Sequence, residues 1–498
     1  MLFTSPIFIF LFLPVFLLIY YSLPKKLRNF FILAASLIFY SWGEGKLIAI
    51  MLISSGIDYI AGIGIANAWR GEIQTLPETG ERSKKQKWFL VLSLLGNLSL
   101  LGFFKYFNFG IENFNALMHA FGFDAAAWES FGKVALPLGI SFYTFQSMSY
   151  TIDVYRGRAT ATRNYITFAA YVTMFPQLVA GPIVRYADVA KELVYRAVTR
   201  ERFAYGVRRF VVGLAKKVLI ANTVAIAADR VFALPVSEIG FGLSWLGVIC
   251  YALQIYFDFS GYSDMAIGLG HMIGFKFLEN FNYPYIAQSL KDFWRRWHMS
   301  MSTWFRDYLY ISLGGNRKSK GRTYLNLIIV FFITGLWHGA SWSFVVWGLW
   351  HGLFLIIERL GFGKILARTW RPLRHLYLLL VVLFGWVLFR AETLPYAWSY
   401  ARAMVGFGAG DNSWETLSLF LSGSLVLALA MGIVGSMRII PGIKTVCANI
   451  VQSVRGGFSV AIRVLFASSE LVLLFGLFII SMMQLASDTY NPFIYFRF

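Results

Sequence analysis

The stretch TYLNLIIVFFITGLWHGASWSFVVWGLWHGLFLII occupies residues 323–357 and contains no Asp, Glu, Lys or Arg. A transmembrane helix needs about 20 mostly apolar residues, so this stretch can hold two short spans, 324–337 and 341–357, joined by a turn. Soluble globular domains rarely contain so long an uncharged run. The stretch therefore predicts a polytopic membrane protein built from helices.

The composition of the whole chain supports that class. Of its 498 residues, 58% are hydrophobic, 18% are aromatic and only 14% are charged. Soluble proteins have roughly 25% charged residues. The two cysteines, Cys250 and Cys447, provide neither a zinc cluster nor a disulfide framework. Composition therefore excludes the secreted, fibrous and disordered classes, and no metal site is expected.

Further uncharged stretches bring the predicted number of crossings to about twelve. Residues 1–24 carry no charge and lack both a basic leading region and a small-residue cleavage site, so we expect a retained first span. The predicted spans are 1–24, 29–43, 47–69, 88–104, 134–152, 210–230, 240–257, 324–337, 341–357, 375–389, 416–437 and 471–487.

The net charge of +20 follows from the loops of this threading. If the N-terminus lies outside, most Lys and Arg residues fall in alternate loops that would face the cytoplasm, among them 185–209, 276–322 and 438–463. Twelve crossings place the C-terminus outside as well. No nucleic-acid partner is needed to explain the charge. Lys216 and Lys217 fall inside a span, where we expect them to face protein or water rather than lipid.

One uncharged segment, 164–184, has basic loops on both sides and contains Pro176, Gly181 and Pro182. Broken backbone at membrane depth is tolerated where it lines a protein-enclosed cavity. The pattern predicts a re-entrant segment beside an internal chamber. Because no linker or internal repeat is apparent, we expect one membrane-embedded domain over residues 1–498.

His338 lies near the middle of the uncharged stretch, between Gly335 and Gly339. Burial there disfavours the charged imidazolium, and a neutral ring can accept a proton, as a general base must. The alternative is a histidine that only hydrogen-bonds between helices. Both interpretations remain open on the residues alone.

His298 lies in the most basic predicted loop, 276–322, where arginines and aromatic residues recur at helical spacing. This pattern is typical of amphipathic helices at a membrane surface. It also suits a surface that receives an anionic, phosphate-bearing donor, because arginine forks match phosphate geometry. The candidate donor contacts are Arg295, Arg296, Trp304, Arg306, Asp307, Asn316 and Trp337.

Asp258 and Asp264 lie at the end of a predicted span, and we expect both to form structural ion pairs, with arginines of the next loop as candidate partners. His351 is expected to be a packing residue. The sequence contains no HExxH, GxSxG, Walker or dinucleotide-binding motif. Metal-dependent, serine-hydrolase, ATPase and nicotinamide chemistries therefore lack support.

Several longer motifs together resemble the membrane-bound O-acyltransferase family, specifically its bacterial branch that includes the membrane subunit of alginate O-acetylation. They cover the chain from about residue 130 to 360. The motifs are ISFYTFQSMSYTIDVYRG (140–157), FPQLVAGPIVR (175–185), YFDFSGYSDMAIGLG (256–270), ENFNYPYIAQSLKDFWRRWHMSMSTWFRDYLYISLGGNR (279–317) and GLWHGASWSFVVWGLWHG (335–352).

The resemblance implies helices around a central funnel in the bacterial inner membrane. Acetyl-CoA or another acyl-CoA would enter from the cytoplasm as the donor substrate, with no bound cofactor, and the acyl group would reach an extracytoplasmic polysaccharide such as alginate. The family's histidine maps onto His338, as the base, and its second polar position onto His298, which would hold donor or acceptor in line. A soluble extracytoplasmic acetyltransferase is the expected partner.

The last residues, NPFIYFRF, resemble a C-terminal ending associated with this branch in which a terminal tyrosine carries the acyl group. By that resemblance Tyr495, in the predicted extracytoplasmic tail 488–498, is a candidate acyl relay. An aromatic anchor at the membrane interface is the alternative.

Two further functions compete with acyl transfer: transport of a polysaccharide precursor and a non-catalytic scaffold in a synthase complex. Transport would be favoured by internal repeats and paired intramembrane acids, and neither is evident in the sequence. A scaffold would tolerate loss of His338. Turnover of acyl-CoA separates the enzyme from both.

Overall fold

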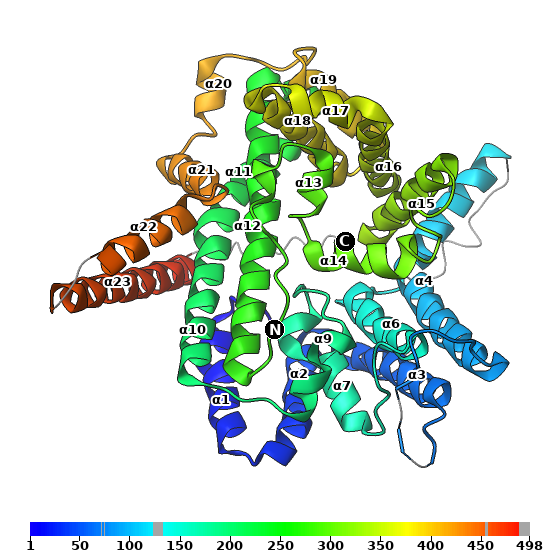
Figure 1. Cartoon of the computed structure of the whole chain (residues 1–498). Coiled ribbons are helices and arrows are strands. Elements are labelled where there is room, and N and C mark those ends of the chain that lie inside the picture. The colour runs from blue at the N-terminus through cyan, green and yellow to red at the C-terminus, as the bar shows by residue number, and fades with distance from the viewer. Residues whose placement is uncertain (71, 74, 123–132, 454–456, 488–498) are drawn as a thin grey trace. The chain divides into compact units, whose positions relative to one another are not determined.

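The computed structural model describes the chain except residues 71, 74, 123–132, 454–456 and 488–498, and the described part is helical, without strands (Figure 1). It divides into two compact units that interleave along the sequence. The first consists of Met1–Gly206, Leu269–Leu278 and Gly339–Ser341, and the second of Val207–Gly268, Glu279–His338 and Trp342–Phe498. The single membrane-embedded domain stays a prediction.

Helices of the first unit pack around a buried helix, α6, most of whose side chains are inaccessible although many are hydroxyls or amides. Its main neighbours are α3 and α4. The elements are α1 (Leu13–Ser22), α2 (Arg28–Glu44), α3 (Ile48–Ala66), α4 (Lys84–Ala120), α6 (Ile140–Arg156), α7 (Tyr165–Thr173), α8 (Phe175–Leu178) and α9 (Tyr186–Val194), with a π-helical turn at Phe8–Phe12 before α1.

A polar cluster explains how α6 can be buried. The Asp58 carboxylate of α3 accepts hydrogen bonds from the Ser93 hydroxyl and from Asn97 Nδ2 at 2.9 Å, both on α4. Thr151 of α6 lies 2.9 Å from the Ser93 hydroxyl. Buried polar groups are tolerated when hydrogen-bonded, so this cluster ties three helices together.

The segment 164–184 is interrupted where the sequence predicts a break. It forms α7 and α8, separated at Met174 and followed by non-helical backbone. At 1.5 Å per residue, α7 is about 14 Å long, which is too short to cross a hydrocarbon core of about 30 Å. Re-entry of this segment into the membrane stays a prediction.

The second unit contains the helices that carry both predicted catalytic histidines. Its complete helices are α11 (Thr223–Phe232), α13 (Leu290–Trp294), α14 (Met299–Trp304), α15 (Lys320–His338), α16 (Trp342–Ile357), α17 (Gly363–Arg368), α18 (Arg371–Arg390), α19 (Leu394–Met404), α20 (Trp414–Ser418), α21 (Gly423–Gly435), α22 (Ile439–Ser453) and α23 (Gly457–Ser487). Two long helices, α10 (Arg200–Ala215) and α12 (Phe241–Ile273), have residues in both units.

Glycines allow α15 and α16 to pack at very short range. A Cβ atom on Gly335 would lie 2.3 Å from the Phe344 carbonyl oxygen, and one on Gly348 would lie 2.2 Å from that of Phe331. No larger residue fits at either position without separating the helices. This close pairing positions the end of α15, where His338 lies.

A π-helical segment, Lys216–Asn222, follows α10 and places two lysines against α12. Lys216 Nζ lies 2.6 Å from Asp264, and Lys217 Nζ lies 2.8 Å from Asp258. The expectation that the lysines face protein is confirmed, and so is the pairing of both carboxylates. The expected partners, arginines of the loop after α12, were wrong. Asp258 and Asp264 pair instead with the two lysines, which precede α12 in the chain, and Arg209 also lies 2.7 Å from Asp264.

The predicted count of twelve spans is not confirmed. Among the described residues, seven helices are long and apolar enough to cross a membrane, or eight if the bent pair of α21 and α22 forms one span. One of the seven, Lys25–Ala66, contains two predicted spans, 29–43 and 47–69. The predicted loop 438–463 was also wrong, because α22 and the start of α23 occupy it.

Candidate active site

The segment from Glu279 to Tyr310 builds one half of the site from short helices. The Ser289 hydroxyl caps α13 by accepting a hydrogen bond from the Asp292 amide at 3.1 Å. Between α13 and α14 the chain turns at His298, whose φ of 42° and ψ of 55° are left-handed. Few non-glycine residues adopt this conformation, and strain of this kind is concentrated at functional sites.

The His298 side chain is completely buried. Its Nδ1 atom lies 3.1 Å from Asn280 Oδ1, and its ring contacts the Phe259 ring edge to face at 4.6 Å between centroids. Burial lowers the pKa of His298 to about 3, because the charged form loses its hydration. The ring is therefore neutral at physiological pH. Within the described residues Nε2 has no hydrogen-bond partner.

His338 is held differently, by aromatic packing at the last residue of α15. Its ring lies edge-on to Trp347 at 4.9 Å and to Phe389 at 5.1 Å between centroids. The side chain is buried apart from a small exposed fraction of 7%. Aromatic rings therefore surround the His338 imidazole on several sides.

Trp337 joins the two histidines. Its ring centroid lies 4.9 Å from that of His338 and 6.0 Å from that of His298. Residues separated by forty positions in the chain are thereby brought to one indole ring. The structure thus places both predicted catalytic residues, and one predicted contact residue, in a single cluster.

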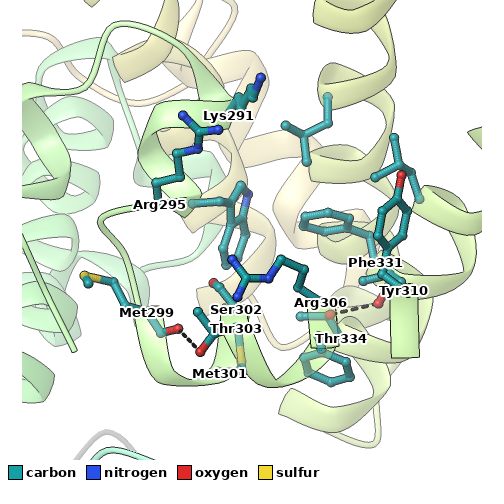
Figure 2. A pocket seen from close by; sticks show the side chains of 15 residues that line it. Lys291, Arg295, Met299, Met301, Ser302, Thr303, Arg306, Tyr310, Phe331 and Thr334 are labelled. Carbon is teal, nitrogen blue, oxygen red and sulfur yellow. Dashed lines mark hydrogen bonds between the residues drawn. The ribbon is translucent and has the colours of Figure 1, made fainter. Parts of the chain in front are cut away.

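A pocket of about 420 Å³ is connected to this cluster through Phe305, which lines the pocket and lies 6.4 Å from Trp337 between ring centroids (Figure 2). Figure 2 shows the Lys291 and Arg295 side chains next to each other, with the Arg306 side chain below them. Opposite these cations the wall is formed mainly by apolar side chains of α15. The lining residues are Lys291, Trp294, Arg295, Met299, Met301, Ser302, Thr303, Phe305, Arg306, Tyr310, Leu327, Val330, Phe331, Thr334 and Leu355.

Two of the predicted donor contacts, Arg295 and Arg306, line this pocket. The Arg306 guanidinium pairs with Asp307 at 2.7 Å, and this hydrogen bond raises the pKa of Arg306. Asp307 therefore acts beside the pocket by orienting an arginine. A guanidinium with one face paired can still offer its other N–H groups to phosphate.

The other predicted contacts lie outside the pocket lining. Arg296 pairs with Asp292 at 3.0 Å, and Trp304 packs on Tyr308 at 5.1 Å between ring centroids. Asn316 accepts hydrogen bonds from Arg359 at 2.9 Å and from the Tyr310 hydroxyl at 2.5 Å. The Gly314–Arg317 turn thus adjoins Tyr310, a lining residue, while Asn316 itself binds protein groups.

Two residues of the site were missed in the sequence. Lys291 adds a third cation to the pocket, and its position four residues before Arg295 was a signal for one helical face. Asn280 contacts His298 from a position eighteen residues away, and no local pattern indicated that contact. Tyr495 lies outside the described residues. His351 is buried between Trp347 and Trp294, at 5.0 and 5.3 Å between centroids, as a packing residue would be.

Comparison with known proteins assigns the family. The model of the membrane-bound O-acyltransferase family matches residues 159–394, which include both histidines. A probable alginate O-acetylase of Azotobacter vinelandii is 43% identical, with all of both chains covered. A peptidoglycan O-acetyltransferase of Helicobacter pylori is 36% identical over 82% of this chain and 80% of that protein.

A more distant similarity extends to a teichoic acid D-alanyltransferase of Bacillus subtilis, which is 31% identical over 42% of this chain and 55% of that protein. The two relatives aligned over most of this chain are both O-acetylating enzymes by name. The described helices include at least seven that are long and apolar enough to span a membrane. The chain is therefore a multi-pass membrane protein of the membrane-bound O-acyltransferase family and acts as an O-acyltransferase.

Proposed function

We propose that the protein moves an acetyl group from cytoplasmic acetyl-CoA across the bacterial inner membrane, for O-acetylation of a cell-surface polysaccharide such as alginate. One observation carries the proposal: a pocket with three cationic side chains and an apolar wall is lined by Phe305, which also packs on Trp337, the ring that both buried histidines contact. The names of the relatives, which acetylate alginate or peptidoglycan, support the acceptor class.

The pocket suits acetyl-CoA for two reasons. Lys291, Arg295 and Arg306 supply positive charge and forked donors for the phosphates of the nucleotide. Apolar side chains of α15, such as Val330 and Phe331, can bury the pantetheine arm that leads to the thioester. Acetyl-CoA is then a substrate that leaves after each turnover, and no resident cofactor is required.

His338 transfers the proton, and His298 aligns the acceptor hydroxyl. The acceptor hydroxyl oxygen attacks the thioester carbonyl carbon, so a C–O bond forms as the C–S bond breaks. Neutral His338 takes the hydroxyl proton and returns it to the departing CoA thiolate, which leaves as the thiol. His298 holds the acceptor hydroxyl in line, and alignment of two bound reactants lowers the entropic part of the barrier.

Orientation follows from the basic loops. We place both termini outside the cell and the basic segment 276–322 in the cytoplasm, where acetyl-CoA is made. The acetyl group then leaves on the outer side, where a soluble acetyltransferase would complete the transfer to the polymer. Tyr495 is the proposed intermediate carrier, its phenol oxygen accepting the acetyl group as an ester.

The test uses inside-out membrane vesicles that contain the full chain, with radiolabelled acetyl-CoA outside and deacetylated alginate oligosaccharides in the lumen. CoA release and label on protein or oligosaccharide are measured. We expect both signals from the natural sequence and their loss in His338→Ala. The matched control is His119→Ala, which alters an exposed histidine at the end of α4.

Each other result has a defined meaning. Natural protein that releases no CoA would contradict the proposed donor. Activity in His338→Ala equal to that of His119→Ala would contradict the proposed base. Loss of protein-bound label in Tyr495→Phe supports the relay, whereas label of natural intensity in that variant shows that Tyr495 does not carry the acetyl group.

A further inference from the structure

Asn280 lies between α12 and the turn that carries His298, and only 1% of it is exposed. Its Nδ2 atom donates a hydrogen bond to the Ser263 hydroxyl of α12 at 3.1 Å. Its Oδ1 atom accepts one from the Ser300 amide at 3.2 Å and another from the Ser300 hydroxyl at 2.9 Å. The carboxamide is therefore engaged at both ends.

These contacts determine which way the carboxamide points. The backbone N–H of Ser300 can only donate, so the Asn280 atom that faces it must be the oxygen. The reversed amide would direct an N–H group at another N–H group. The Ser263 hydroxyl, which can accept, lies at the nitrogen end.

The orientation of Asn280 in turn determines the protonated nitrogen of His298. Nδ1 lies 3.1 Å from the same Oδ1 atom. A carbonyl oxygen carries no hydrogen, so Nδ1 must hold the proton of this bond. A neutral imidazole has a single N–H group, and Nε2 is then an acceptor with a free lone pair.

The backbone of Asn280 holds the same turn. The Met299 amide donates to the Asn280 carbonyl oxygen at 2.9 Å, directly after the left-handed His298. Glu279, the preceding residue, is anchored by the Arg209 guanidinium through bonds of 2.9 and 2.5 Å. The backbone contacts of Asn280 can therefore restrain the strained conformation of His298.

We propose that Asn280 is a positioning residue: it fixes His298 in the Nδ1–H form, so that Nε2 accepts the hydrogen bond of the acceptor hydroxyl during acyl transfer. The proposal rests on the role of His298 in the proposed function. A buried acceptor without a partner is unfavourable, and Nε2 has none among the described residues. A substrate hydroxyl supplies that missing donor, whereas the other tautomer would present an N–H group to it.

Lys291 of α13 and Arg295 directly after it, shortly before the turn, line the pocket, and further charged groups around the turn are in ion pairs. Asp264 of α12 pairs with Lys216 and Arg209, Asp258 of α12 pairs with Lys217, and Arg296 pairs with Asp292. His338 is the titratable neighbour across Trp337. All of these groups remain in an Asn280 variant, so the ratio of variant to natural rates removes their contributions to a pH profile.

The decisive variant is Asn280→Asp, which keeps an oxygen acceptor and adds a negative charge. The carboxylate stabilises the imidazolium and so raises the pKa of His298. Nε2 is then protonated at low pH and becomes an acceptor again as the pH rises. We expect the ratio of variant to natural kcat/KM, measured by CoA release from acetyl-CoA, to rise at least about tenfold between pH 6 and pH 9.

The control is Asn326→Asp, at a buried asparagine whose Nδ2 donates to the Leu313 and Gly315 carbonyls at 3.3 and 3.2 Å. The ratio of Asn326→Asp to natural kcat/KM should not rise with pH. A new buried carboxyl group ionises only at higher pH, where its charge disrupts packing. A flat ratio for folded Asn280→Asp would overturn the positioning role. If that variant does not fold, Ser263→Ala, which removes the hydrogen-bond acceptor of Asn280 Nδ2 and so loosens the carboxamide, must lower kcat without changing the KM for acetyl-CoA. An unchanged kcat would overturn the proposal.

His298→Ala separates this inference from the function on which it rests. Full activity in His298→Ala refutes the role of His298 itself. An inactive His298→Ala together with a flat Asn280→Asp ratio leaves the proposed function in place and refutes only the part assigned to Asn280.

Discussion

His298 and His338 occupy two regions that surround a histidine ring with different contacts. His298 lies in a left-handed turn between two short helices, where its Nδ1 donates a hydrogen bond to Asn280 Oδ1, which also accepts one from the Ser300 amide. His338 ends a long helix and is enclosed by the rings of Trp337, Trp347 and Phe389. The contacts described around His298 include directional hydrogen bonds, and those described around His338 are ring packing contacts.

The difference corresponds to the two tasks proposed for them. A residue that aligns a hydroxyl needs a defined tautomer and direction, which hydrogen bonds provide. A residue that takes and returns a proton needs mainly a neutral ring in a dry environment, which packing provides. The comparison predicts that the two regions respond differently to substitutions that remove hydrogen bonds and to those that disturb packing.

The largest effect is expected from His298→Asn. Asparagine tolerates the left-handed conformation better than most residues, so the turn should persist while the ring nitrogen is lost. We expect CoA release to fall by about 10²-fold, because misplacement of a reacting group by about 1 Å can cost that much. The thermal unfolding temperature should stay close to that of the natural protein. Unfolding of the variant at a much lower temperature would mean that the ring mainly supports the fold.

Lys217→Met tests the frame on which the His298 region rests. It leaves the Asp258 carboxylate buried without its cation, which costs about 3–5 kcal/mol for a fully buried pair. The double change Lys217→Met with Asp258→Leu should recover most of that stability, because no isolated charge remains. Chemical or thermal unfolding in detergent measures both. Equal stability of the single and double variants would show that the pair contributes no net attraction.

Gly335→Ala disturbs the packing of the His338 region alone. The added methyl group would lie 2.3 Å from the Phe344 carbonyl oxygen and must separate α15 from α16. Overpacking of this kind costs about 1–3 kcal/mol. Activity should fall together with stability. Gly321→Ala is the control, since nothing lies within 4 Å of a Cβ atom at that position of the same helix.

The smallest effect is expected at the pocket. Arg295→Ala removes one of three cations, and loss of a charge-assisted phosphate contact should raise the KM for acetyl-CoA about tenfold with little change in kcat. Arg296→Ala is the matched neighbour, already paired with Asp292 and outside the lining, and should leave KM within a factor of two or so. Equal KM values for the two variants would place the donor elsewhere.

Features that depend on composition and on the spacing of charged residues and prolines were predictable from the sequence. The helical membrane class, the broken segment 164–184 and the orientation of Lys216 and Lys217 toward protein follow from where charges and prolines occur along the chain, whereas the aspartates that pair with the lysines do not. Individual spans were less predictable. Helices such as α6 and α15 carry many polar residues, and the apolar helix α21 gives no sign of the bend between it and α22.

The residues of the candidate site were also only partly predictable from the sequence. His298 and His338 stand out locally because each is unusual in its own surroundings. The left-handed turn at His298 contacts Asn280, which lies eighteen positions earlier in the chain. Lys291 belongs to the pocket because α13 faces α15 and α16, which no one-dimensional pattern indicates. The sequence therefore indicated the two histidines but not Asn280 or Lys291 beside them.

In the proposed mechanism both histidines act in the transfer of the same acetyl group. The most direct test compares CoA release in His298→Ala, His338→Ala and the double variant, in the same vesicles and at saturating acetyl-CoA. Residues that act as a unit are strongly non-additive, so the double variant should be no slower than the slower single variant. Losses that multiply in the double variant would contradict the claim, because each ring would then serve a separate step.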